Sequence, residues 1–248
     1  MIEQKSEREL VYIRDAGRIV AETHRELKKA CRAGVTTKEL DRIAEEYIVA
    51  KGAVPTCKGY HGYPATICAS VNEEVVHGIP GARVLRNGDI IAIDITAGFN
   101  GYLADSCNTL PVGEISSEAQ RLLKVTEESL YKGIEQAVIG NRLSDISNAV
   151  QTHVESNGFS VVRDFCGHGI GREMHEEPAI PNYGRPGHGP RLKRGMCLCI
   201  EPMVNEGTFE VSVLEDDWTA VTDDGKLSAH FEHTVAVTDA GPLILTEL

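Results

Sequence analysis

Apolar residues recur every three to four positions in four stretches of the chain, a pattern that predicts four amphipathic helices. Thr36 precedes Glu39 in the pattern of a capping box and therefore marks the start of the second helix. Gly52 and Pro55 mark its end. The predicted helices cover residues 6–32, 36–52, about 117–138 and about 144–156.

Between these helices the pattern changes to β-branched and apolar runs bounded by turn residues, which is typical of strands. Asn100-Gly101 separates two long runs and predicts a two-residue hairpin, and Asp224-Gly225 predicts another. The glycine- and proline-rich segment 166–190 also contains histidine and acidic residues, so we expect an ordered loop there. The predicted strands cover residues 65–71, 89–99, 102–112, 159–165, 195–204, 210–221 and 227–237.

The order of elements is two helices followed by strands, and then the same again. The sequence contains no literal repeat and no linker rich in proline or serine. We therefore expect one domain over residues 1–248, of the α+β class, with two similar halves around one sheet.

Composition excludes several classes of protein. Lys and Arg total 25 against 37 Asp and Glu, and a net charge of −12 argues against a broad nucleic-acid interface. The 42% hydrophobic content excludes wholesale disorder. No run of 18 apolar residues and no N-terminal signal core occur, so we expect no membrane span and no secretion. Seven scattered cysteines without a C-x-x-C pair fit a reducing cytoplasm.

The predicted hairpin places two aspartates on one face. A turn at Asn100-Gly101 puts Asp105 opposite Thr96, and Asp94 shares a face with Thr96 because side chains alternate along a strand. Asp94 and Asp105 are then diagonal neighbours, roughly 7–8 Å apart at Cα. Two carboxylates on a buried face repel each other and need protons, basic partners or cations.

Three more ionisable residues lie in apolar or glycine-rich segments: His168, Glu201 and Glu232. Each alone also fits a loop-capping histidine or a salt-bridged core acid. Together with Asp94 and Asp105 they form an oxygen-rich set with one nitrogen, which suits two divalent metals. Paired metals generate a bridging hydroxide at neutral pH, so these residues predict metal-assisted hydrolysis of either a peptide or a phosphate ester.

These residues occur in the order typical of a known family. The chain resembles the type I methionine aminopeptidases of the short bacterial form, which lack an N-terminal zinc-binding extension. The resemblance covers essentially the whole chain. It implies the pita-bread fold, with pseudo-symmetric α/β halves around a curved antiparallel sheet, and removal of the initiator methionine when the second residue is small. The matching segments are Gly59-Tyr-His-Gly-Tyr-Pro64, Ser70-Val-Asn-Glu-Glu-Val-Val-His77-Gly-Ile-Pro80, Gly88-Asp-Ile-Ile-Ala-Ile-Asp94, Gly167-His-Gly-Ile-Gly171, His175-Glu-Glu-Pro178, Gly195-Met-Cys-Leu-Cys-Ile-Glu201-Pro-Met-Val204 and Glu232-His-Thr234.

The resemblance also implies a role for each metal ligand. Asp94 would bind one metal with both oxygens. Asp105 and Glu232 would bridge the two metals, and His168 and Glu201 would complete the other. The metals would be manganese, iron, cobalt or zinc, because this ligand set accepts all four. A monovalent cation is implied at backbone oxygens near three residues, Asn72, Glu74 and Ser228.

Three residues are implied to carry the chemistry. Glu201 would act as general base and pass its proton to the leaving amine. His77 would contact the substrate and assist proton handling, and His175 would donate to the scissile carbonyl oxygen. The pocket for the methionine side chain, which is soft and partly sulfur-lined, would be formed by Cys57, Tyr60, Tyr63, Cys68, Met174 and Trp218.

The implied partner is the N-terminal methionine of nascent polypeptides, with transient ribosome contact, no DNA and no membrane; the implied state is a monomer. The chain departs from the family pattern at Tyr102-Leu103-Ala104-Asp105, where His-Gly-Asp is usual, and at Met174, where an aromatic residue is common. One rival is a proline-directed pita-bread peptidase, whose extra N-terminal domain has no room in the 93 residues before Asp94. The other rival is a catalytically inactive binding or ribosome-associated module, which would lack a ligand or a histidine.

Overall fold

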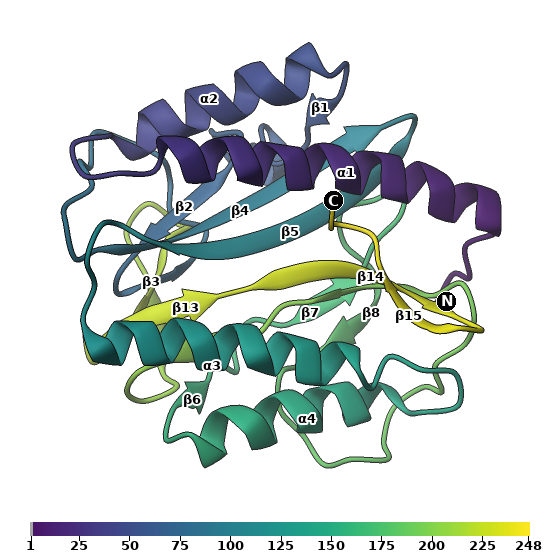
Figure 1. Ribbon diagram of the computed structural model, residues 1–248. Coiled ribbons are helices and arrows are strands. Elements are labelled where there is room, and N and C mark those ends of the chain that lie inside the picture. The colour runs from purple at the N-terminus through teal and green to yellow at the C-terminus, as the bar shows by residue number, and fades with distance from the viewer. Residues whose placement is uncertain (1) are drawn as a thin grey trace.

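The computed structural model describes residues 2–248, and it contains the four predicted helices (Figure 1). Their bounds are Glu7–Ala30 (α1), Thr37–Ala50 (α2), Ser117–Ile134 (α3) and Leu143–Ser156 (α4). The Ser6 and Thr36 side chains accept hydrogen bonds from the backbone amides of Glu9 and Glu39, which satisfies donors that a helix start leaves free. Helix α3 ends four residues before its predicted end, and the chain continues as turns.

A nine-stranded sheet forms the centre of the molecule, and two three-stranded sheets flank it. The nine strands are β1 (Val54–Pro55), β2 (Cys68–Val71), β4 (Ile90–Phe99), β5 (Tyr102–Pro111), β7 (Gly167–Gly169), β8 (Glu176–Ile180), β9 (Cys197–Ile200), β14 (Glu232–Thr238) and β15 (Gly241–Ile244). The small sheets consist of β6 (Ser160–Val161), β10 (Met203–Asn205) and β13 (Ser228–His230), and of β3 (Glu74–Val76), β11 (Val211–Val213) and β12 (Ala220–Thr222). A short 3₁₀ helix, η1, covers Tyr60–Gly62.

Strands β4 and β5 pair in the predicted register, and their pairing is antiparallel. Thr96 lies opposite Asp105, and the turn residues Asn100 and Gly101 have φ values of 53° and 80°. Positive φ at both central residues is the geometry of the hairpin turns that match strand twist. The prediction that Asp94 and Asp105 share one face of the sheet is therefore confirmed.

Two predicted strands break at the same corner of the structure. The predicted strand 195–204 divides at Glu201-Pro202 into β9 and β10, and 227–237 divides at Phe231 into β13 and β14. Strands β9 and β14 pair in the large sheet, whereas β10 and β13 pair in a small one. Pro202 has no N–H to donate to the hydrogen-bond ladder of the large sheet. The two segments that follow β9 and precede β14 therefore leave that sheet here and pair in a small one.

Four other predictions need correction. Segment 210–221 is not one strand but the hairpin β11–β12, because Asp216 accepts backbone hydrogen bonds from Trp218 and Thr219 and folds the chain back. Asp224-Gly225 forms a turn but no hairpin, since β12 pairs with β11 and β3 while β13 pairs with β10. The predicted strand 159–165 shortens to β6, and the predicted loop 166–190 contains β7 and β8.

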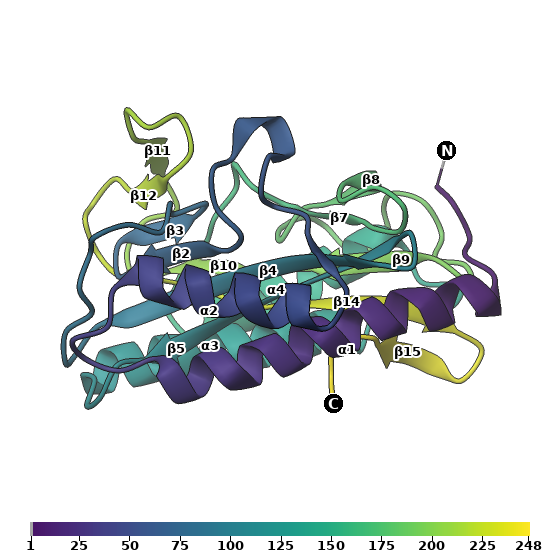
Figure 2. The same ribbon diagram turned by 90° about the horizontal axis from the view of Figure 1, so that it is seen from above.

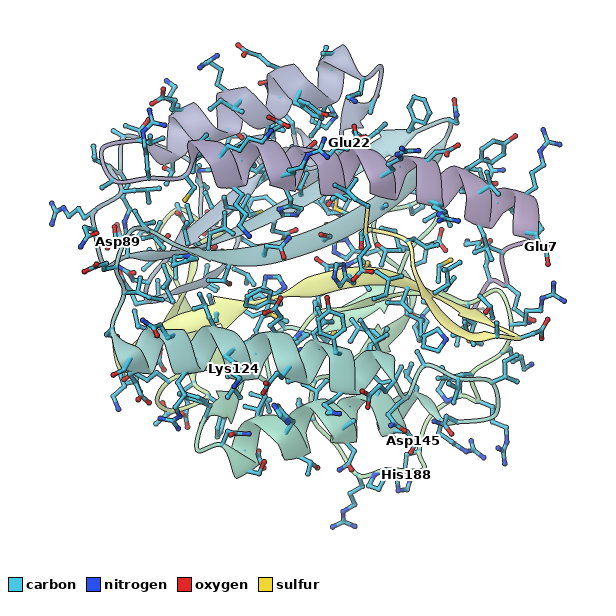
Figure 3. The ribbon with its side chains drawn as sticks, viewed as in Figure 1. Glu7, Glu22, Asp89, Lys124, Asp145 and His188 are labelled. Atoms are coloured by element: carbon cyan, nitrogen blue, oxygen red, sulfur yellow. The ribbon has the colours of Figure 1, made fainter. Side chains whose placement is uncertain are left out.

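Helices α1 and α3 lie on one side of the large sheet, while η1 and the β11–β12 hairpin project from the other (Figure 2). Ile91, Ile93 and Ile95 of β4 are fully buried in the core shared with α1 and α2. A second core joins α3 and α4 to β9 and β14. Charged helix residues such as Glu7 and Lys124 lie on the outer surface (Figure 3).

Each half of the molecule thus has its own helix pair and its own core beneath a shared sheet, which is the expected pita-bread architecture. Because side chains alternate along β4, the positions between the core isoleucines face away from the helices. That second face carries Asp94 and Thr96. No helix within residues 2–248 has the length and apolar character needed to cross a bilayer.

Candidate metal centre and active site

The five predicted metal ligands converge on the face of the sheet opposite the helices. They come from β4, β5, β7, β14 and the end of β9. One ligand atom each of Asp105, His168, Glu232 and Cys199 lie within 4.8 Å of one another. His168 Nε2 lies 3.4 Å from Glu201 Oε1. The ladder explains this convergence, because Asp94 and Glu232 both pair with Cys107, one on each side of β5.

Three of the carboxylates have a buried oxygen with no hydrogen-bond partner in the described residues: Asp94 Oδ1, Asp105 Oδ1 and Glu232 Oε1. The pKa values of three carboxyls lie well above the usual range, those of Asp94, Glu201 and Glu232. The larger cause is burial and the second is repulsion from the charge of Asp105. Unpaired buried oxygens cost free energy unless protons or cations satisfy them. The arrangement therefore fits divalent metal ions held by oxygen and one nitrogen.

His168 has its ring oriented for metal binding. Its Nδ1 lies 2.9 Å from the backbone oxygen of Gly169. A carbonyl oxygen only accepts, so Nδ1 carries the hydrogen and Nε2 keeps its lone pair. Burial lowers the pKa of His168, which keeps the ring neutral. A backbone partner of this kind commonly fixes the tautomer of a ligating histidine.

Asp105 is oriented by neighbours to which the sequence analysis gave no such role. The Thr96 hydroxyl donates to Asp105 Oδ2 at 2.8 Å, and the Cys57 thiol lies 3.4 Å from the same hydroxyl oxygen. Thr234 bonds both the amide and the carbonyl of Asp105, at 3.0 and 2.8 Å. These contacts hold the carboxylate in place while Oδ1 stays free for a ligand.

Divalent metal is expected to raise the melting temperature, and more so at pH 7.5 than at pH 5.5. The buried carboxylates have folded-state pKa values above their unfolded values, so their contribution to stability is present at low pH and lost as pH rises. A metal at 100 times its Kd adds about 2.7 kcal/mol to the free energy of unfolding.

Thermal melts with EDTA or with manganese at both pH values check this expectation. The Asp105→Asn variant is the matched control, because it removes one of the repelling charges. It should melt higher than the wild type in EDTA and gain less from manganese. Equal melting temperatures of the wild type with and without metal would contradict the metal site.

A cavity of about 190 Å³ adjoins the carboxylates. It is lined by all eight residues predicted to bind substrate: Cys57, Tyr60, Tyr63, Cys68, His77, Met174, His175 and Trp218. The sequence did not single out Phe165, Cys166 and Met203, which also line it. Two of them could have been found by their closeness in sequence to predicted ligands, because Cys166 lies two residues before His168 and Met203 lies two residues after Glu201.

Aromatic contacts fix the walls of this cavity. The Tyr63 ring meets Trp218 edge-on, with ring centroids 5.0 Å apart. The Tyr63 hydroxyl lies within hydrogen-bond distance of the backbone oxygens of Ile67 and Gly78, at 3.1 and 3.0 Å. Met174 is buried in the same cluster. The result is an apolar pocket with sulfur and aromatic surfaces that ends at the carboxylates.

The two predicted catalytic histidines lie at the rim of the metal centre. His175 packs its ring against that of His168, with centroids 4.3 Å apart, and its Nδ1 lies 2.7 Å from the Tyr60 hydroxyl oxygen. Burial lowers the pKa of His175 to about 4. His77 lies edge-on to Trp218 at 6.2 Å. Both imidazoles can therefore serve as neutral hydrogen-bond donors near the cavity.

One buried histidine near the site escaped the sequence analysis. His230 is 2% exposed, and its Nε2 lies 3.7 Å from Glu201 Oε2 without a hydrogen-bond partner in the described residues. Its position two residues before Glu232 was the only signal, because alternate residues of a strand share a face. Asn182, also unforeseen, donates to the backbone oxygen of Glu201 at 2.9 Å.

The departure at residues 102–104 divides between the two faces of the sheet: Tyr102 and Ala104 lie on the helix side, whereas Leu103 also packs against the pocket cluster. Tyr102 is buried and its hydroxyl links Glu9 and Arg172, at 2.8 and 2.7 Å. Ala104 is fully buried beside α1. Near the predicted monovalent cation site, the Ser228 amide donates to the backbone oxygen of Asn72 at 2.8 Å, so the structure brings these two residues together.

Comparison with known families accounts for this constellation. The sequence profile described as "Metallopeptidase family M24" matches residues 11–239. The chain belongs to metallopeptidase family M24. Membership in M24 makes the protein a metal-dependent hydrolase.

Similar proteins agree with the M24 assignment along the whole chain. The protein is 60% identical over 248 residues to "Methionine aminopeptidase 1" of Bacillus subtilis (strain 168), with complete coverage of both chains. The crystal structure of the methionine aminopeptidase from Thermotoga maritima has a TM-score of 0.99 and 46% identity, again with complete coverage of both chains. The prolidase from Pyrococcus furiosus, at 21% identity and a TM-score of 0.81, shares the fold; the match covers 99% of this chain and 65% of that one.

Proposed function

We propose that the protein is a methionine aminopeptidase that removes the N-terminal methionine of polypeptides whose second residue is small. The observation that carries the proposal is the cavity of about 190 Å³, lined by sulfur and aromatic groups, that ends at the five ligands. The 60% identity to a protein named methionine aminopeptidase supports it. The presence of all five ligands and both histidines argues against an inactive binding module.

The pocket favours a methionine side chain on physical grounds. A thioether is apolar and polarisable, and it gains dispersion energy against aromatic edges and sulfur atoms. Tyr63, Trp218 and Met174 supply such surfaces. Asp94 and Asp105 line the same cavity, so the proposed metal ligands lie beside the pocket that would hold the first side chain.

Asp94, Asp105, His168, Glu201 and Glu232 would hold two divalent metal ions, drawn from manganese, iron, cobalt and zinc. Bound metal supplies charge that acidifies water and stabilises a developing oxyanion. A monovalent cation near Asn72, Glu74 and Ser228, transient ribosome contact, a monomeric state and a cytoplasmic location remain predictions.

The chain's own residues divide the proton handling between them. Glu201, at the corner between β9 and β10, would accept the proton of the attacking water and pass it to the leaving amine. In the metal-free protein, burial raises the pKa of Glu201. His175 would donate a hydrogen bond to the scissile carbonyl oxygen, and His77 would contact the substrate beside Trp218.

The test is hydrolysis of two peptides, Met-Ala-Ser and Ala-Pro-Ser, by metal-stripped protein reloaded with manganese, iron, cobalt or zinc. We expect cleavage of the methionine peptide only, dependent on added metal, with release of free methionine. A Met-Leu-Ser peptide is the matched control for the second residue and should be cleaved more slowly.

The other outcomes each identify a different activity. Cleavage of the proline peptide alone would replace the proposal with a proline-directed peptidase. No cleavage with any of the four metals, from a folded sample, would leave the binding module as the better account.

A further inference from the structure

We propose that Tyr60 is a positioning residue that fixes the tautomer of His175, so that the Nε2–H of His175 points toward the substrate. The inference deepens the proposed function and rests on it for the role of His175. It assigns to the Tyr60 hydroxyl a task separate from that of its ring, which lines the methionine pocket.

The contact joins two loops that are far apart in sequence. Tyr60 Oη lies 2.7 Å from His175 Nδ1, and the two ring centroids are 5.3 Å apart with planes inclined by 40°. The Tyr60 hydroxyl has no other hydrogen-bond partner in the described residues. The contact therefore specifies one end of the imidazole and leaves Nε2 as the nitrogen available to a substrate.

The loop that carries Tyr60 is built to hold it. Gly59 and Gly62 have φ values of 89° and 90°, which glycine adopts without a steric cost. The Gly59 amide donates to the Tyr63 oxygen at 2.8 Å, and the Tyr60 amide donates to the Cys57 oxygen at 3.0 Å. These backbone bonds place the phenol over the rim of the pocket, beside the segment that carries His175.

The hydrogen-bond chemistry decides between two tautomers. If the phenol donates to a bare Nδ1, the hydrogen of the neutral imidazole lies on Nε2, where it can be donated to a carbonyl oxygen. If Nδ1–H donates to the phenol instead, Nε2 presents a lone pair. A lone pair repels a developing oxyanion, so only the first arrangement serves the role proposed for His175.

The neighbouring His168 has the opposite tautomer, because its Nδ1 has a different hydrogen-bond partner. His168 places its hydrogen on Nδ1, toward the Gly169 oxygen, and keeps the Nε2 lone pair for metal. The ring of His175 lies tilted against it, with centroids 4.3 Å apart, and places its hydrogen on Nε2. His168 can thus act as a metal ligand because its Nδ1 meets an acceptor. His175 can act as a hydrogen-bond donor because its Nδ1 meets a donor.

Nitrogen-15 NMR of histidine-labelled, zinc-loaded protein tests the assignment directly, and the His175→Gln variant identifies the signals of His175. In the wild type we expect a protonated Nε2 and an unprotonated Nδ1. In Tyr60→Phe, which keeps the ring but not the hydroxyl, we expect a mixture of tautomers. Tyr131→Phe is the matched control, because its hydroxyl contacts Glu247 and its ring lies 6.0 Å from His233, away from the site.

Steady-state kinetics on Met-Ala-Ser gives the second readout. For Tyr60→Phe we expect kcat to fall about 10- to 100-fold, as for other residues that orient a functional histidine, with KM within about twofold and zinc affinity unchanged. Tyr131→Phe should change none of these values. A mere pocket-lining role would instead raise KM and leave the His175 signals as in the wild type.

Several outcomes would overturn the inference. They are a wild-type spectrum with hydrogen on Nδ1, a Tyr60→Phe spectrum identical to the wild type, and an unchanged kcat in Tyr60→Phe. Failure of the proposed function looks different. The wild type would then not cleave the methionine peptide, while the NMR spectra would still report the tautomer of His175.

Discussion

The Asp105→Ala variant is expected to lose hydrolysis of methionine peptides. Asp105 lies within the cluster of ligand atoms, and its Oδ1 is buried with no hydrogen-bond partner in the described residues. Removing it would take away one of the proposed ligands and leave the charge of bound metal poorly balanced. A bound metal contributes several kcal/mol to a hydrolytic transition state, so kcat/KM should fall by about 10³-fold or more.

The loss of activity should coincide with a loss of metal. Titration of metal-stripped protein with manganese, followed by calorimetry, should show weaker binding and lower stoichiometry in Asp105→Ala than in the wild type. Asp15→Ala is the matched control, because Asp15 is an exposed carboxylate on α1. It should retain wild-type binding and turnover. Wild-type turnover in Asp105→Ala would remove the shared-ligand role of Asp105.

The parts of the fold that could be predicted are those set by local chemistry. Periodicity located all four helices, and the predicted cap Thr36 acts at the start of α2. Asn100-Gly101 fixed the register of β4 and β5, and with it the shared face of Asp94 and Asp105. These features depend on neighbours in sequence, so a sequence pattern contains the information.

The parts that could not be predicted depend on partners far along the chain. The turn at Asp224-Gly225 is real, with Gly225 at φ 70°, but the strands on its two sides choose partners in different sheets. The corner at Glu201-Pro202 exists because β9 and β14 pair in the large sheet, whereas the next strands, β10 and β13, pair with each other in a small one. Strand partners are a tertiary property, and propensity does not specify them.

The same distinction applies to the site. The five predicted ligands and the eight predicted pocket residues followed from the family resemblance, and the structure places all of them around one cavity. The residues that orient them are not marked. Thr96 and Thr234 hold Asp105 across strands, and His230 approaches Glu201 through a small sheet. A threonine in a strand is ordinarily just a β-branched strand former, so only the three-dimensional contact reveals its task.

His175→Ala is expected to lower kcat strongly while the metals remain bound, which separates the donor role from the ligand role. His175 lies outside the ligand cluster, although its ring packs against His168. Burial lowers its pKa to about 4, so at neutral pH it is an uncharged donor whose loss changes no net charge. Loss of one donor to a developing oxyanion typically costs about 10²- to 10³-fold in kcat.

The measurement pairs kinetics with metal binding in His175→Ala and His175→Gln. Manganese affinity should stay near the wild-type value in both variants. Glutamine offers an amide N–H at a similar reach, so His175→Gln should recover part of the activity lost in His175→Ala. His188→Ala, at an exposed histidine on a surface loop, should behave like the wild type. Unchanged kcat in His175→Ala would remove the donor role, whereas loss of manganese binding would make His175 a support of the metal centre instead.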